Sequence, residues 1–343
     1  MRRTAVSTVK RFRRQLAAFL LLLLFTLPVA RIAAAGGAEE SGGAEAASGE
    51  PAAAGADGPT RLRIGLMPAM NSVPLLVADR EGFFADEGLQ VELEMFRSQL
   101  YRESALQAAE IDGTISDLVN VMNAWENALG VRAVLRTEGV FSLVTSGESG
   151  IVDVSDWNAR ESVETGLVAD SIVFYVAERM LEAAGGNPDN IDLVPVVQLP
   201  NRVELVAAGR LEAAVLPEPL TWVALRGGAN DFLTTELLDE TPGVLLFRDE
   251  VLQEDPAAVR ALVRAYGGGV EAINADPDAY RAFIAEAASF PEFVVDSMRI
   301  PRFGNPQAPS EDLVFDVARW MLAKGLLEAA PEYQDVVWDG LSR

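Results

Sequence analysis

Short strand-like segments alternate with helical segments from residue 61 to residue 216, and this alternation limits the folds that the chain can adopt. Residues 61–66 alternate apolar and polar side chains, whereas residues 74–85 follow the helical period and stop before Gly88. The same reasoning predicts strands at 89–96, 113–117, 131–136, 140–145, 163–168, 191–197 and 213–216, and helices at 104–111, 119–129, 171–184 and 202–208. This order predicts an α/β fold in which largely parallel sheets are covered by helices on both faces.

The pattern changes after Pro242, where long helices replace the alternation. Helices are predicted at 256–274, 277–288 and 310–324, and Pro256 and Pro277 stand near helix starts, a position that proline favours. The body of roughly 280 residues that begins near Thr60 is larger than one hydrophobic core usually supports, so we expect two lobes.

The first 59 residues have the composition of an export signal followed by a leader. Basic residues and no acidic ones precede an apolar run at 16–30, and the alanines at 33–35 provide a cleavage site. We predict a cleaved signal peptide at 1–35, exported by the general secretory or the twin-arginine route. The alternative is an uncleaved membrane anchor, which Pro28 and Arg31 disfavour. Residues 36–59 contain no aromatic residue and are predicted to be a disordered leader.

Histidine and cysteine are absent from the chain, and lysine occurs only at positions 10 and 324. These absences exclude Ser-His-Asp and Cys-His catalysis, His/Cys zinc sites and disulfides. The chain has 28 basic and 51 acidic residues, and loss of the seven basic residues before residue 36 would change the net charge from −23 to −30. We therefore expect no nucleic-acid partner. No calcium-loop spacing occurs either, so no metal is expected.

Several short motifs occur in an order that is typical of one group of transport proteins. Ile64-Gly-Leu is followed by PLLVADREGFFADEGLQVE at 74–92, by AAEIDG at 108–113 with Ser116-Asp117, by AGRLEAAV at 208–215 and by Pro217-Glu-Pro. Taken in this order, the motifs resemble the solute-binding proteins of ABC importers. More narrowly, they resemble the group that takes nitrate, sulfonates, taurine or thiamine-pyrimidine precursors.

The resemblance extends over residues 61–335 and implies the two-lobed periplasmic-binding-protein fold of type II. Each lobe would be a mixed, mostly parallel sheet flanked by helices, with a hinge between the lobes. Lobe 1 is expected at 61–147, lobe 2 at 148–243, and C-terminal helices at 244–343 would return to lobe 1. The resemblance further implies a periplasmic monomer that binds a small molecule without a cofactor and delivers it to the permease and ATPase of an ABC importer.

Ligands in open α/β sheets bind beyond the carboxyl ends of the strands, so the turns after the predicted strands supply candidate contacts. The candidates are Asn71, Ser72, Asp117, Asn120, Thr137, Glu138, Asp170, Ser171, Asn201, Glu218 and Trp222, with Asn123 as a further one.

Other roles are open for many of these residues. Ser72 and Ser171 are equally suited to be helix N-caps, and Asp170 could favour a helix N-terminus through the helix dipole. Glu218 could pair with a hinge arginine, and Asn201 could cap its own helix. The aromatic residues Trp125, Phe141, Tyr175 and Trp222 could belong to the core instead of the site.

The candidate set contains four carboxylates and several amides, and it places no arginine or lysine at a strand end. The nearest basic residues are Arg136, Arg202 and Arg302. Such a cleft suits a donor-rich, flat or cationic ligand, so we favour an aminopyrimidine within the group. Many members also carry a Gly/Ser-rich segment where this chain has Asp170, which is a poor partner for an anion.

Other functions stay open from the sequence. One is an anion binder of the same group, for nitrate, a sulfonate or taurine. Others are a secreted sensor subunit and a hydrolase that uses two carboxylates such as Asp117 and Glu218. Relatives that synthesise the thiamine pyrimidine need a Schiff-base lysine and a histidine of their own, and this chain has no histidine. We therefore predict that the protein is not an enzyme and has no catalytic residues.

Overall fold

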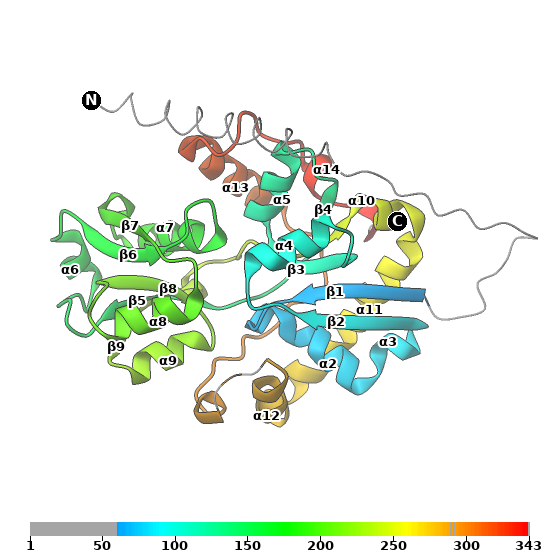
Figure 1. The fold of residues 1–343 in the computed structure, drawn as a ribbon, viewed down its shortest axis with the longest axis horizontal. Helices are drawn as coiled ribbons and strands as arrows, with labels where there is room; N and C mark the ends of the chain where they lie inside the picture. The colour runs from blue at the N-terminus through cyan, green and yellow to red at the C-terminus, as the bar shows by residue number, and fades with distance from the viewer. Residues whose placement is uncertain (1–59, 289, 291, 342–343) are drawn as a thin grey trace, which may run out of the picture. The chain divides into compact units, whose positions relative to one another are not determined.

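The computed structural model describes residues 60–288, 290 and 292–341, which belong to one compact unit (Figure 1). The predicted signal peptide at 1–35 and leader at 36–59 lie outside the described residues. Within the described residues, no helix combines the length and apolar character that a membrane span requires.

The first sheet has five strands in the order β2-β1-β3-β10-β4. β1 (Thr60–Leu66), β2 (Leu89–Met95) and β3 (Gly113–Asp117) pair in parallel. β10 (Gly243–Arg248) enters between β3 and β4 (Val131–Arg136) and is antiparallel to both. The sheet is therefore mixed, as predicted.

The second sheet has the same design, with the order β7-β6-β8-β5-β9. β6 (Val163–Leu167) pairs in parallel with β7 (Ile191–Pro195) and β8 (Ala213–Pro217). β5 (Phe141–Ser146) is antiparallel to β8 and to β9 (Ala229–Thr234). In each sheet one strand is inserted antiparallel between two others, β10 in the first sheet and β5 in the second, which confirms the α/β fold class with two mixed sheets.

β5 belongs to the second sheet, whereas the predicted first lobe at 61–147 would include it. β5 pairs only with strands of the second sheet, so the chain leaves the first sheet between β4 and Phe141. The chain comes back at β10, where lobe 2 was expected to end. Periodicity predicts that a segment is a strand, but it does not tell which sheet the strand joins, because pairing partners lie far away in the sequence.

The thirteen α-helices of the described chain cover both faces of each sheet. They are α2 (Val73–Glu81), α3 (Phe83–Asp86), α4 (Gln99–Gln107), α5 (Leu118–Glu126), α6 (Val154–Asn158), α7 (Ile172–Ala184), α8 (Leu199–Ala207), α9 (Leu220–Arg226), α10 (Asp249–Glu254), α11 (Pro256–Ala275), α12 (Pro277–Ala287), α13 (Glu311–Lys324) and α14 (Tyr333–Val336). α2, α3, α11 and α12 pack on one face of the first sheet, and α4, α5 and α14 on the other. α7 covers one face of the second sheet, and α8 with α9 covers the other.

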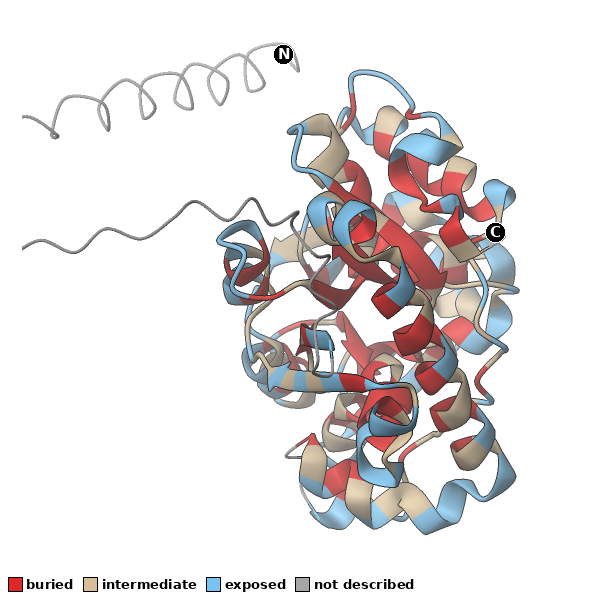
Figure 2. Cartoon of the chain, turned by 90° about the vertical axis from the view of Figure 1, so that its right-hand side faces the viewer, coloured by how far each residue is buried: buried red, intermediate tan, exposed pale blue. Residues whose placement is uncertain are grey.

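The core consists of strand residues that alternate between these two helical layers. In β10, Val244 and Leu246 face the layer of α4 and α5, whereas Leu245 and Phe247 face the layer of α2 and α11. Figure 2 shows the buried residues concentrated in the strands and on the inner sides of the helices. A central strand buried on both faces becomes a continuous apolar run.

The helix α13 contacts both halves of the molecule. It packs on α5 of the first lobe, and its polar side chains bond to α7 of the second lobe. The hydroxyl of Tyr175 donates to Asp316 at 2.7 Å, and the indole of Trp320 and the ammonium of Lys324 both donate to Glu178 at 2.5 Å. The C-terminal helices therefore do more than return to lobe 1.

Candidate functional site

A cleft of about 370 Å³ lies where strands of both sheets end. The first sheet contributes the turn after β1 at 67–71, the segment 97–103 after β2 and the end of β3 at 115–117. The second sheet contributes the turn after β6 at 168–173 and the segment 197–202 after β7. The location agrees with the rule that ligands bind beyond the carboxyl ends of strands.

Three helices of nine residues or more begin at this cleft without a side-chain cap. The N-cap residues Ser98 of α4, Ser171 of α7 and Gln198 of α8 line the cavity, and none accepts a hydrogen bond from its own helix. The hydroxyl of Ser171 instead donates to the carbonyl of Val168 at 2.5 Å. The backbone N–H groups of these first turns have no side-chain acceptor, and such helix ends attract anions.

Three arginines line the same cavity: Arg97, Arg102 and Arg202. Arg202 is 2% exposed and donates to the carbonyl oxygens of Val196 at 2.9 Å and Val215 at 2.7 Å. Burial lowers the pKa of Arg202 to about 10, which keeps its guanidinium protonated at neutral pH. No carboxylate of the described chain forms an ion pair with it, so its charge is not neutralised locally.

Arg102 is 5% exposed, and its guanidinium is only partly satisfied. It donates to the hydroxyl of Ser116 at 3.1 Å and lies 3.6 Å from a carboxylate oxygen of Glu103. Its Nε atom is buried without a hydrogen-bond partner among the described residues, and so is the Oδ1 atom of Asn71 in the same cavity. Burying an unpaired polar atom is costly, so these two atoms mark positions where a ligand could supply the missing partner.

Two carboxylates of the cleft, Asp117 and Asp170, differ in their surroundings: the first is buried and caps a helix, and the second has a strained backbone. Asp117 is 4% exposed, and burial raises its pKa to about 6. It caps α5 by accepting from the backbone N–H and the side-chain amide of Asn120, at 3.0 and 2.8 Å. Asp170 has φ +59°, in the left-handed region that non-glycine residues rarely adopt. Strained backbone of this kind often occurs at functional turns.

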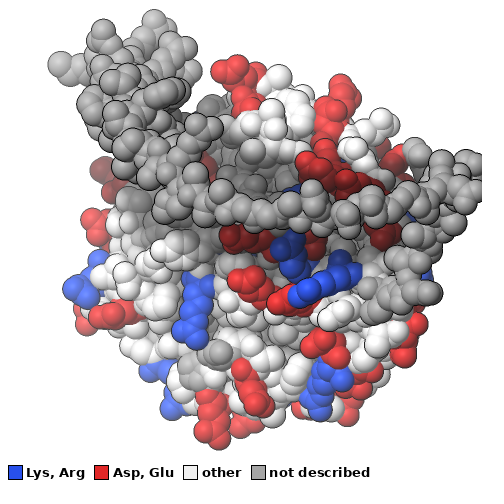
Figure 3. Space-filling model, turned by 45° about the vertical axis from the view of Figure 1, so that its right-hand side comes forward, with Lys and Arg blue, Asp and Glu red and all other residues white. Residues whose placement is uncertain are grey.

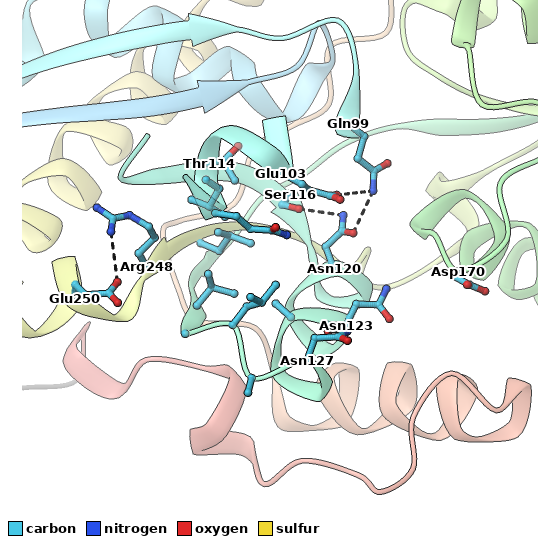
Figure 4. A pocket seen from close by; sticks show the side chains of 18 residues that line it. Gln99, Glu103, Thr114, Ser116, Asn120, Asn123, Asn127, Asp170, Arg248 and Glu250 are labelled. Atoms are coloured by element: carbon cyan, nitrogen blue, oxygen red, sulfur yellow. Dashed lines mark hydrogen bonds and ion pairs between the residues drawn. The ribbon is translucent and has the colours of Figure 1, made fainter. Parts of the chain in front are cut away.

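A second cavity of about 510 Å³ adjoins the cleft (Figure 4). It lies between α4 and α5 and shares Gln99, Glu103, Ser116 and Asp170 with the cleft. Its own lining includes Asn120, Asn123, Asn127 and Gln107, and Arg248 with Glu250 stands at one end.

The structure brings together some of the residues predicted from the strand ends. Asn71, Asp117, Asp170 and Ser171 line the cleft, and Asn120 and Asn123 line the adjoining cavity with Asp170. Ser72 is the buried N-cap of α2, but its hydroxyl donates to the carbonyl of Met67 at 2.8 Å. The remaining predicted residues lie outside both cavities: Thr137, Glu138, Asn201, Glu218 and Trp222.

The residues outside the cavities have other surroundings, although Thr137, Glu138, Glu218 and Trp222 also have buried polar atoms without a hydrogen-bond partner among the described residues. Thr137 is fully buried behind β10, and Glu138 pairs with Arg136 at 3.1 Å. Asn201 is exposed on α8. Glu218 lies 3.4 Å from Arg299, the arginine partner that its alternative role required, and Arg299 stands over the Trp222 ring. Asp117 and Glu218 therefore do not meet in the cleft as a hydrolytic pair would.

The aromatic candidates divide between core and cleft. Phe141 lines the cleft. Tyr175 is buried and bonded to Asp316, and Trp125 packs against the core of the first lobe.

The expectation that no arginine stands at a strand end is contradicted by the lining of the cleft. Arg97 lies two residues after the end of β2 at Met95, and the rule that selects the turns after the first, third and fourth strands selects it too. Arg102 was missed because α4 begins at Gln99 rather than at residue 104, which places Arg102 in the first turn. Ser98 precedes α4 without a capping box, because Tyr101 stands where Glu or Gln would complete it.

Acidic and basic side chains are interspersed on the face drawn in Figure 3, which has no broad basic area among the described residues. The described residues also contain no group of three or more acidic side chains arranged to hold a metal ion.

Two mixed α/β sheets with a ligand-sized cleft at their strand ends define a two-lobed binding protein, and the comparisons with known proteins agree. Residues 55–289 match the model of the NMT1-like family, so this chain belongs to the NMT1-like family. The resemblance inferred from the motif order is thereby confirmed.

Known structures share the fold at low sequence identity. The periplasmic aliphatic sulphonate binding protein SsuA from Escherichia coli is 15% identical with a TM-score of 0.67, and the match covers 82% of this chain and 92% of that one. The alkanesulfonate-binding protein SsuA from Xanthomonas axonopodis pv. citri, bound to MOPS, is 18% identical with a TM-score of 0.68 and covers 82% and 99%. The periplasmic nitrate-binding protein NrtA from Synechocystis is 15% identical with a TM-score of 0.67 and covers 83% and 87%.

Two curated relatives are similar in sequence. The nitrate import ATP-binding protein NrtC of Synechococcus elongatus is 25% identical over 223 residues, which are 60% of this chain and 34% of that protein. The chain thus spans about a third of the length of this relative. An ABC transporter periplasmic binding protein of Brachyspira hyodysenteriae is 23% identical over 237 residues, which are 64% of this chain and 67% of that protein.

Proposed function

We propose that this protein is the extracytoplasmic solute-binding component of an ABC importer and that it binds a small organic anion of the sulfonate type in the cleft. The observation that carries the proposal is the meeting of buried Arg102 and Arg202 with three uncapped helix N-termini in one cavity. Membership of the NMT1-like family and the sulfonate- and nitrate-binding relatives support it.

The anionic group would be held by the free Nε of Arg102 and by backbone N–H groups at the start of α7. Charge-assisted hydrogen bonds of this kind are the strong ones. The carbon part of the ligand would contact the apolar side chains of the cleft, among them Met67, Ile115, Phe141, Val173 and Leu199. The unpaired Oδ1 of Asn71 would accept from a donor group on the ligand.

Binding and release would serve import, with no catalytic step. The two lobes would close around the ligand and present it to a membrane permease that works with an ATPase. We expect a monomer that carries a cleaved export signal and uses no cofactor. A permease gene and an ATPase gene beside the gene for this protein would support import, whereas a receptor-kinase gene would support the sensor alternative.

The proposal is tested by calorimetric titration with 1-butanesulfonate, taurine and nitrate. We expect at least one of them to bind, and Arg102→Gln to weaken its binding about 10-fold or more, because a charged hydrogen bond is lost. Arg61→Gln is the matched control, since Arg61 is exposed and its one ion pair among the described residues is with Glu92 at 2.8 Å; the affinity of this variant should stay within about twofold of the wild-type value. Unchanged affinity in Arg102→Gln, or failure of both 1-butanesulfonate and taurine to bind, would contradict the proposal.

An aminopyrimidine remains the second candidate ligand, as predicted from the sequence. Three carboxylates, Asp117, Glu103 and Asp170, line the cleft together with the ring of Phe141, and they suit a flat ligand that carries amino groups. The same titration includes 4-amino-5-hydroxymethyl-2-methylpyrimidine. Binding of this compound without a response to sulfonates would favour the second candidate over the first.

A further inference from the structure

The cavity that adjoins the cleft has a lining dominated by side-chain amides. Asn120, Asn123 and Asn127 follow one another at spacings of three and four residues along α5 and its C-cap, so they share one face of the helix. Figure 4 shows them along the cavity, with Gln99 of α4 bonded to Asn120. Asparagine is a poor helix former, so helix stability does not explain this stripe.

Part of this amide set is already engaged within the protein. Asn120 accepts from the amide of Gln99 at 3.1 Å and donates to the hydroxyl of Ser116 at 3.2 Å. Asn127 donates to the backbone carbonyl of Asn123 at 2.7 Å. The side chains of Asn123 and Gln107 have no hydrogen-bond partner within the described chain. The cavity therefore presents amide donors and acceptors that are free to bind a ligand.

Most charges near this cavity are paired inside the protein. Arg248 lies 3.3 Å from Asp112 and 3.4 Å from Glu250, and it also donates to the carbonyl of Ile111. Glu103 accepts from Gln99 at 2.8 Å and lies beside Arg102. An amide-lined cavity whose arginine is already satisfied suits an uncharged group with hydroxyls or amides, because such a group both donates and accepts.

We propose that this cavity holds the uncharged, hydroxyl- or amide-bearing part of the same ligand whose anionic group binds in the cleft. The two cavities share four lining residues and are therefore adjacent, so a ligand anchored in the cleft would extend past these side chains into the second cavity. The ligand class is then a polar organic anion such as a sugar sulfonate, rather than a plain alkanesulfonate. This inference rests on the proposed function.

A matched pair of probes tests the inference by calorimetric titration of the full protein. 6-Deoxy-6-sulfo-D-glucose and 1-hexanesulfonate carry the same anionic group on six carbons, and only the first has hydroxyls. We expect the sugar sulfonate to bind at least about 10-fold more tightly. Asn123→Ala should weaken its binding about 3- to 10-fold, since neutral hydrogen bonds are lost, and leave hexanesulfonate within about twofold.

Two further variants keep the result interpretable. Gln107→Ala, on the α4 side of the cavity, should produce the same selective loss. Gln253→Ala is the matched control, because Gln253 is an exposed amide on α10 that lines neither cavity, and it should leave both affinities unchanged. Equal binding of the two sulfonates, with no effect of Asn123→Ala, would overturn the inference while the proposed function stands. Failure of both six-carbon sulfonates to bind would overturn the inference, and the proposed function would fall with it only if 1-butanesulfonate and taurine also fail to bind.

Discussion

Glu218 shows how the surroundings of one residue can change its charge. It follows β8, its side chain is fully buried, and neither carboxylate oxygen has a hydrogen-bond partner in the described chain. Burial raises its pKa to about 8, although Arg299 at 3.4 Å opposes the shift, and the nearby Asp231 and Glu236 add to it. The carboxyl is therefore protonated in the folded protein at neutral pH.

This raised pKa predicts a pH dependence of stability. The unfolded chain loses the Glu218 proton near its ordinary pKa, whereas the folded protein keeps it until about pH 8. The free energy of unfolding of the wild type should therefore fall relative to Glu218→Gln as pH rises from about 4.5 to about 8, by at most about 1.4 kcal/mol per pH unit. Urea unfolding at pH 5, 6.5 and 8 measures this difference.

The comparison of the wild type with Glu218→Gln isolates the titration of Glu218, because every other titrating group is common to the two proteins. A difference between them that stays constant over this pH range would mean that Glu218 is ionised in the folded state and paired with Arg299.

The arginines of the cleft differ in how well their positions can be predicted from the strand ends. Arg97 lies just beyond the end of β2, and Asp117 is the last residue of β3, so the strand-end rule selects both. Arg202 was recognised as a nearby base, but its position beneath the carbonyls of Val196 and Val215 depends on how α8 packs against the second sheet. Side-chain direction is set by that packing, and the sequence does not contain it explicitly.

At the scale of elements, α11 contains three consecutive glycines that would weaken an isolated helix. A Cβ atom on Gly269 would lie 2.1 Å from the backbone carbonyl oxygen of Pro74, because α11 and α2 pack very closely at this point. Backbone cannot move aside as a flexible side chain can. The close approach therefore explains a residue that helix propensity disfavours.

Gly269→Ala should destabilise the protein by about 1–3 kcal/mol, because the added methyl group overpacks the contact between α11 and α2. Thermal and urea unfolding measure the loss.

Gly267→Ala is the matched control in the same helix. Its Cβ atom would meet only the ring of Pro306 at 3.3 Å, so the gain in helix propensity offsets the tight contact. A Gly269→Ala protein as stable as Gly267→Ala would contradict the close approach of the two helices.

Elements differ in how well they could be predicted. α7, α11, α12 and α13 lie within one residue of their predicted bounds, because their apolar stripes are long. β9, β10 and the short helices α6, α9, α10 and α14 were not predicted. β10 has the apolar run Val244–Phe247 without alternation because both of its faces are buried, and a short run of this kind does not distinguish a strand from a buried helix.

At the scale of the whole molecule, α13 links the two lobes through Trp320. Its indole packs edge-on against Phe174 and Tyr175 of α7 and donates to Glu178, while the helix also packs on α5. Contacts with both lobes should make the described chain unfold as one cooperative unit.

Trp320→Ala should remove much of this link. We expect differential scanning calorimetry to show one transition for the wild type and two for the variant, with a calorimetric enthalpy larger than the van't Hoff enthalpy. Trp157→Ala is the control of equal size, because Trp157 is buried within the second lobe and bonded to the carbonyl of Asn187. Trp157→Ala should reduce the free energy of unfolding by about 3–5 kcal/mol and so lower the midpoint temperature, but the protein should still unfold in a single transition. Two transitions in the wild type would show that α13 does not couple the lobes.

The sequence by itself determined the α/β class, the family and the exclusion of histidine- and cysteine-based chemistry, because these depend on local periodicity, motif order and composition. Only the tertiary structure decided that β5 joins the second sheet, that Arg97, Arg102 and Arg202 share a cleft with Asp117 and Asp170, and that Glu218 and Trp222 lie away from it. The physical reason is that strand pairing and side-chain direction depend on contacts between segments far apart in the chain. The proposed ligand chemistry rests on those contacts, which place buried positive charge in a cleft that was expected to be acidic.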